Sequence, residues 1–176
     1  MIVPRSGDRY VMPEGQGEYL VVKSHEETGG EYVEMEWTLP PGAFAPPPHR
    51  HPSQVEEYEV LDGSFEVMVD GDWRKLGPGD KASVPIGVNH TFRTLPGETL
   101  RVRNFHRPGA RFDEFVEKQH RFVNSERYKG LKHPSTAVVM AMAWREHRDL
   151  LVPTNPLLRG AMAGLERLGK MLGYRI

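Results

Sequence analysis

The stretch that decides the fold runs from Gly42 to Gly63 and reads GAFAPPPHRHPSQVEEYEVLDG. His49 and His51 are two residues apart, so on an extended segment both imidazoles leave the same face. Glu56 then opens an alternating run, and Tyr58 shares its face. If that face is internal, a carboxylate and a phenol join the two imidazoles. The stretch therefore indicates a metal site built from nitrogen and oxygen ligands.

A second stretch, residues 79–94, reads GDKASVPIGVNHTFRT and supplies a third histidine. His90 follows a corner formed by Pro85 and Gly87, and it begins another alternating run. Such a corner places the imidazole at the start of a strand. We expect this strand to close the ligand set from the opposite wall.

These two stretches resemble the two motifs of the cupin superfamily. The first has a glycine, two histidines separated by one residue, a glutamate and a closing glycine; the second has glycine, Pro-x-Gly and histidine. Two departures are present: six residues instead of the usual five separate Gly42 from His49, and Thr94 replaces an asparagine. The resemblance implies a single-domain, metal-binding cupin similar to the quercetin dioxygenase-like members. Its implied metal ligands are His49, His51, Glu56 and His90.

The strand pattern predicts a mainly β fold for residues 1–110. Short alternating runs separated by Gly/Pro corners are typical of an antiparallel sandwich or barrel. We expect strands at residues 18–24, 32–39, 64–69, 72–76, 81–84, 90–94 and 99–105, with a short edge strand at 10–12. The resemblance narrows this to an antiparallel double-stranded β-helix, the jelly-roll or cupin barrel.

Residues 111–176 read instead as a C-terminal α-helical extension packed on the barrel. Apolar residues at helical spacing predict a helix over 111–123. Ser135 is expected to cap a second helix that extends through Trp144. This helix is apolar on almost all of its faces, so we expect it to be buried. Asn155 and Pro156 mark the start of a third helix that ends near Gly173.

Composition excludes several classes of function. The formal charge is −1 and charges of both signs are mixed throughout, so we expect neither a nucleic-acid nor an acidic-membrane partner. The chain has no cysteine, which rules out disulfides and thiolate metal sites. It has no signal-peptide pattern and no apolar run that could span a bilayer, so we expect a cytoplasmic protein. Uncovered barrel edges and apolar helices favour a homodimer.

Most other candidate residues have an ordinary structural explanation. We interpret the remaining histidines as surface residues or hydrogen-bonded core residues, namely His25, His106, His120, His133 and His147. Among them, His106 ends the last predicted strand and lies near the site. Alternating Arg101 and Arg103 are interpreted as an outer face rather than a substrate anchor. Thr94 is expected to supply a hydroxyl near His90. Apolar residues are expected to line the pocket, namely Phe44, Phe92, Val60 and Val102.

The metal and the reaction stay open at this stage. Imidazole and carboxylate ligands suit Fe, Mn, Ni, Cu or Zn. We expect a metal-dependent, dioxygenase-like enzyme acting on an enol, phenol or diketone-like small molecule, with Glu56 and Tyr58 as catalytic groups. The alternatives are a metal-dependent isomerase or epimerase, and a non-catalytic small-molecule-binding protein with a structural metal. The fold alone does not choose among them.

Overall fold

The computed structural model describes residues 3–175 and contains a β-structure followed by helices. The strands are β1 (Arg9–Met12), β2 (Gly17–Lys23), β3 (Val33–Leu39), β4 (His49–Arg50), β5 (Val55–Asp62), β6 (Phe65–Val69), β7 (Asp72–Leu76), β8 (Lys81–Val84), β9 (His90–Thr94), β10 (Leu100–Arg107) and β11 (Val152–Pro153). The helices are α1 (Phe112–Val123), α2 (Pro134–Glu146) and α3 (Pro156–Met171).

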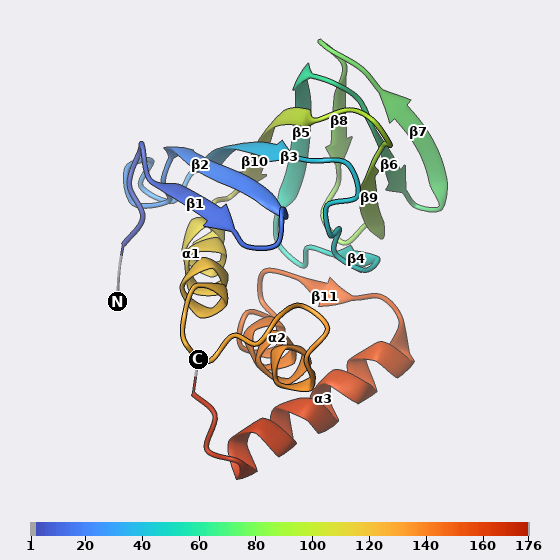
Figure 1. Ribbon diagram of the computed structural model, residues 1–176. Coiled ribbons are helices and arrows are strands. Elements are labelled where there is room, and N and C mark those ends of the chain that lie inside the picture. The colour runs from blue at the N-terminus through green and yellow to red at the C-terminus, as the bar shows by residue number, and fades with distance from the viewer. Residues whose placement is uncertain (1–2, 176) are drawn as a thin grey trace.

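The strands form two antiparallel sheets, ordered β1-β2-β3-β10-β5-β8 and β11-β4-β9-β6-β7. Figure 1 shows the two sheets curving around a common interior, with the helices grouped below the end where β4 and β11 lie. This arrangement confirms the predicted double-stranded β-helix with helices after it. The strand expected at residues 99–105 extends further, through Arg107.

Local turn chemistry explains where the strands reverse. Asp70 and Gly71 both have positive φ, at 53° and 95°, which is the geometry of the tight hairpin joining β6 to β7. Gly63 closes the turn after β5 with φ at 72°, and a Cβ there would lie 2.4 Å from the Thr99 carbonyl oxygen. Only glycine fits that approach, so the turn is fixed by sequence.

Alternation along β3 separates the core from the outer surface. Val33, Met35 and Trp37 are buried, and the glutamates between them face outward. Arg103 on β10 pairs with Glu34 at 3.2 Å on that outer face. The interpretation of the β10 arginines as surface residues is therefore confirmed.

The three helices begin close to their predicted positions. Asn155 caps α3, with its side-chain oxygen accepting from the amides of Leu157 and Leu158 at 2.9 and 3.3 Å. The cap predicted for α2 is wrong: His133, not Ser135, occupies the N-cap and accepts from the Ser135 amide.

The helical extension contributes to the same core as the barrel. Phe112, Phe115, Trp144 and Leu150 are buried in one apolar cluster with barrel residues such as Trp37. The helices thus cover one end of the barrel. Within residues 3–175, no helix has the length and apolar character needed to cross a membrane.

Candidate metal centre

Four potential ligand side chains converge inside the covered end of the barrel. His49 lies on β4, His51 follows that strand, Glu56 lies on β5 and His90 begins β9. One ligand atom from each lies within 4.8 Å of the others, and all four residues are buried. The structure therefore brings together all four ligands expected from the sequence.

Strand register produces this convergence. The pairing of β4 with β9 sets His49 opposite His90. The pairing of β10 with β5 sets His106 opposite Glu56. Because paired residues in adjacent strands project to the same face, each pairing delivers two side chains to the interior.

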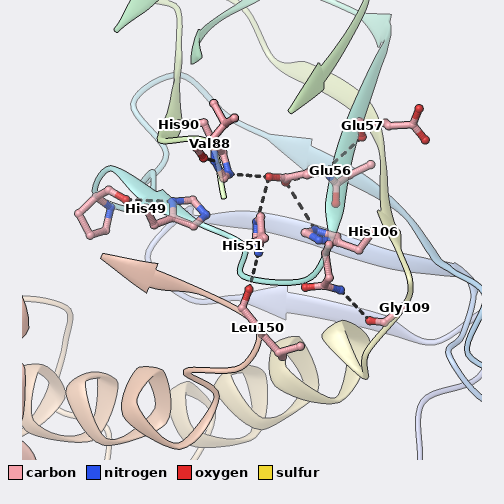
Figure 2. Close-up of polar contacts among 12 residues, drawn as sticks. His49, His51, Glu56, Glu57, Val88, His90, His106, Gly109 and Leu150 are labelled. Carbon is pink, nitrogen blue, oxygen red and sulfur yellow. Dashed lines mark hydrogen bonds and ion pairs between the residues drawn. The ribbon is translucent and has the colours of Figure 1, made fainter. Parts of the chain in front are cut away.

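Each of the three candidate histidine ligands is oriented by a backbone carbonyl. Nδ1 of His49 lies 3.0 Å from the Pro47 carbonyl oxygen. Nδ1 of His51 lies 2.6 Å from the Leu150 carbonyl oxygen, and Nδ1 of His90 lies 3.1 Å from that of Val88. Figure 2 shows these contacts pointing away from the centre of the cluster. A carbonyl only accepts, so Nδ1 carries the proton and Nε2 presents a lone pair.

The Nε2 atoms of two histidines face one oxygen of Glu56. Oε2 lies 3.2 Å from Nε2 of His51 and 2.8 Å from Nε2 of His90. The other oxygen, Oε1, accepts a hydrogen bond from the Asn104 amide at 2.9 Å. Lone pairs facing a carboxylate oxygen repel unless a proton or a cation lies between them.

The electrostatics of the cluster favour bound cations. Burial lowers the pKa of His49 to about 3, with the charges of His90 and His51 acting in the same direction. Burial acts to raise the pKa of Glu56, but the neighbouring His106 and the close contacts with Nε2 of His51 and His90 hold it well below its usual range. Neutral His49 and ionised Glu56 are in the protonation states that metal ligation requires. Burial acts to lower the pKa of His90, but its contact with Glu56 and the charge of that carboxylate raise it.

The donor set therefore fits a divalent transition metal. Three imidazole nitrogens and one carboxylate oxygen suit Fe, Mn, Ni, Cu or Zn. The Nε2 of His90 is buried and lacks a well-aligned hydrogen bond within residues 3–175, which also fits a site for an ion.

His106 belongs to this neighbourhood, although we interpreted it from the sequence as a surface or satisfied core residue. Its Nε2 lies 3.5 Å from Glu56 Oε1, and neither ring nitrogen has a hydrogen-bond partner in the described part of the chain. Burial, stronger than the opposing charge of Glu56, lowers its pKa well below the usual range. The sequence signal for His106 was its position at the end of the last predicted strand; its pairing with Glu56 is seen in the structure.

Three further sequence expectations have different outcomes. Tyr58 points into the barrel, where it is buried between Phe65 and Phe92, with ring centroids 5.6 and 6.4 Å away. Thr94 does not support His90, because its hydroxyl accepts from the Gly42 amide at 3.0 Å. Phe44 does not line the barrel interior: it is 61% exposed, since the proline-rich segment carries it outside.

Residues of the helical extension close the cluster from below. The Trp144 ring lies 5.8 Å from the His49 ring, and Phe112 stacks on His106 at 3.6 Å. The Leu150 carbonyl that orients His51 comes from the segment between α2 and β11. The extension is thus part of the site's surroundings.

Comparison with known proteins gives one family and several similar structures. Residues 35–104 match the family model described as Cupin domain. Quercetin 2,3-dioxygenase from Bacillus subtilis is 31% identical over 107 residues, which are 57% of this chain and 32% of that protein. The chain thus spans about a third of the length of the curated relative it matches.

The structural similarities concern the fold. KdgF from Halomonas sp. aligns with TM-score 0.50 and 24% identity over 61% of this chain and 90% of its own. An RmlC-like cupin from Shewanella frigidimarina aligns with TM-score 0.50 and 21% identity over 61% and 88%. The family match over residues 35–104, the two-sheet fold and the converging imidazoles together support a cupin barrel in this part of the chain.

Proposed function

We propose that the protein is a metal-dependent oxygenase that acts on an enol, phenol or diketone-like small molecule. The observation that carries this proposal is the buried convergence of three imidazoles and a carboxylate within 4.8 Å. The similarity to quercetin 2,3-dioxygenase over 107 residues supports the oxygenase class.

The residues around the cluster have distinct roles in this proposal. His49, His51, Glu56 and His90 would hold a transition metal, which would supply Lewis acidity and, if redox-active, one-electron chemistry. Carbonyl contacts fix the imidazoles, and the Asn104 amide holds one oxygen of Glu56. The ionised Glu56 can accept the proton of a substrate hydroxyl. Burial of Tyr58, and then the charge of Glu56, raise the pKa of Tyr58 well above its usual range, so this phenol stays protonated as a donor.

The test combines metal analysis with oxygen consumption. Protein purified without a metal-affinity tag should contain close to one equivalent of iron, nickel, copper or manganese. The same sample should consume oxygen with enol or phenol compounds, and Glu56→Gln should lower that rate by about 10²- to 10⁴-fold, the usual contribution of a general base. Turnover that persists without oxygen would contradict the oxygenase and indicate an isomerase or epimerase.

One observation favours a second candidate, a non-catalytic small-molecule-binding protein with a structural metal. Tyr58, Phe65 and Phe92 pack against one another inside the barrel beside the cluster. A barrel interior filled by side chains leaves less room for a substrate, so in this candidate the metal stabilises the fold and takes no part in a reaction. Removing the metal with a chelator should then lower the melting temperature strongly, without any oxygen uptake before removal.

A further inference from the structure

A large cavity lies outside the barrel, between its lower rim and the helical extension. Its volume is about 760 Å³, within the range of small-molecule sites. The walls come from β2, the segment before β4, and all three helices; among the lining residues are Tyr19, Phe44, Trp144, Met162 and Leu165. Figure 1 shows the three helices on the lower side of the sheets, with α2 and α3 below β11.

Three polar side chains of the lining are already bonded within the protein. The Tyr128 hydroxyl donates to Glu14 Oε1 at 2.7 Å, and the Thr136 hydroxyl donates to the Gly130 carbonyl at 2.8 Å. Gln16 Oε1 accepts from the Phe44 amide at 2.6 Å. The cavity therefore offers an occupant mainly apolar contact.

One charge remains available to an occupant. Among the lining residues in the described part of the chain, Lys132 is the one that carries a charge. It is exposed at the cavity's edge. A single lysine in an otherwise apolar lining is complementary to an apolar molecule with one anionic group.

The cavity adjoins the metal centre. Trp144 lines it and also contacts the His49 ring at 5.8 Å. Pro47 lines it as well, and its carbonyl is the one that orients His49. An occupant is thus separated from a candidate ligand by one indole ring.

The outer surface of the cavity explains two exposed apolar side chains. Phe44 and Leu131 are 61% and 36% exposed, and both line the cavity. Their position makes the cavity open to solvent, so a small molecule can enter without unfolding of the helices.

We propose that this cavity binds an apolar small molecule carrying one anionic group, with Lys132 pairing with that group. The identification of this molecule as the substrate of the adjacent centre rests on the proposed function. Binding itself does not, because none of the candidate metal ligands lines the cavity.

The test uses two fluorescent probes of similar shape on the full-length protein. 1-Anilinonaphthalene-8-sulfonate carries one negative charge, and N-phenyl-1-naphthylamine carries none. Both should bind with about one site per chain. Ala137→Trp places an indole in the cavity from an exposed position of α2, and should weaken both probes by about tenfold or more. Ser83→Trp, on the exposed face of β8, should leave both affinities unchanged.

The charge is tested separately. Lys132→Met should weaken the sulfonate probe by about threefold, as expected for an exposed ion pair, and leave the neutral probe unchanged. Equal weakening of both probes would overturn the role of Lys132.

Two further outcomes would overturn the cavity assignment. Unchanged probe binding in Ala137→Trp would place the probes elsewhere. A dimer that dissociates in Ala137→Trp, measured by light scattering, would assign the surface to a second copy of the chain. Probe binding by metal-free protein separates this inference from the proposed function. The cavity can bind the probes in a protein that consumes no oxygen, and oxygen uptake can occur in a protein whose cavity binds no probe.

Discussion

The imidazoles of His49, His51 and His90 are fixed at Nδ1 by backbone carbonyls before any ion binds. Because these side chains are already held in place, they lose little conformational freedom when a metal ion binds. Loss of a residue that only hydrogen-bonds to a metal ligand lowers metal affinity by ~10- to 100-fold. We expect His49→Ala and His90→Ala, which remove a ligand itself, each to lower it by more. Competition with a chelating dye measures the affinity.

The same variants should keep the fold. The barrel core is built from apolar residues that do not include the ligands, so the far-ultraviolet circular dichroism should be unchanged. His133→Asn is the matched control, because asparagine also caps helices and His133 lies outside the cluster. Full metal content in either ligand variant at neutral pH would show that the ligand assignment is wrong.

Glu27 provides a pH-dependent contribution to stability. Its Oε2 lies 2.6 Å from the Ser6 hydroxyl and accepts from the Ser24 amide at 3.0 Å. The hydrogen bond from Ser6, followed by that from the Ser24 amide, lowers the pKa of Glu27 from 4.5 to about 2. A lowered folded-state pKa stabilises the protein above the unfolded value, and this stabilisation is lost as pH falls through the folded value.

We therefore expect Glu27→Gln to lower the free energy of unfolding at pH 7, with the difference from wild type shrinking below pH 4.5 and vanishing only below pH 2. Urea denaturation at pH 7, 4 and 2.5 measures this. A difference that stays constant with pH would mean that the carboxylate charge contributes nothing.

Individual residues also show where sequence reasoning reaches its limit. The spacing of His49, His51, Glu56 and His90 was sufficient to predict that they lie together. Alternation along a strand puts these side chains on one face, and the folded strands keep that face inside. His106 was missed because its role depends on the register between β10 and β5, a long-range pairing that no local pattern contains. Thr94 was misassigned for a similar reason, since its partner Gly42 lies 52 positions away.

At the scale of elements, α2 and α3 pack through a glycine. A Cβ on Gly169 would lie 2.4 Å from Met142 Sδ and 2.8 Å from Val138 Cγ1. We expect Gly169→Ala to lower the free energy of unfolding by about 1–3 kcal/mol through overpacking. Gly164 in the same helix has no atom within 4 Å of that position, so Gly164→Ala should stabilise by roughly 0.5–1 kcal/mol. Urea denaturation of both variants gives the comparison, and equal effects would contradict close packing.

Most elements were predictable because their signals are local. Alternation identified the strands β7, β8 and β9 with their observed bounds. The Asn155-Pro156 pair identified the start of α3. The two-residue strands β4 and β11 were not identified, because each is defined by long-range pairing: β4 with β9 in the barrel, and β11 with β4 where the extension lies against the barrel. The route of residues 43–48, which carries Phe44 outside, has no periodic signal either.

At the scale of the whole molecule, one apolar cluster joins the barrel to part of the extension. Phe112 and Trp144 of the extension are buried in the same cluster as Trp37 and Val60 of the barrel. A shared core makes the two parts unfold together, even though the sequence divides them near residue 110. Helix ellipticity at 222 nm and tryptophan fluorescence should therefore report one coincident thermal transition.

Phe112→Ala tests this coupling. Phe112 stacks on His106 at 3.6 Å and is 8% exposed, so its truncation should remove about 3–5 kcal/mol and shift the whole transition. Phe122→Ala in the same helix should remove less, because Phe122 is half-buried and its ring contacts Tyr128 of the extension at 6.0 Å. If Phe112→Ala instead splits the helix signal from the barrel signal, the extension is an independent domain. In that case the carbonyl of Leu150 could leave His51 without unfolding the barrel, and metal affinity would vary with the docking of the helices.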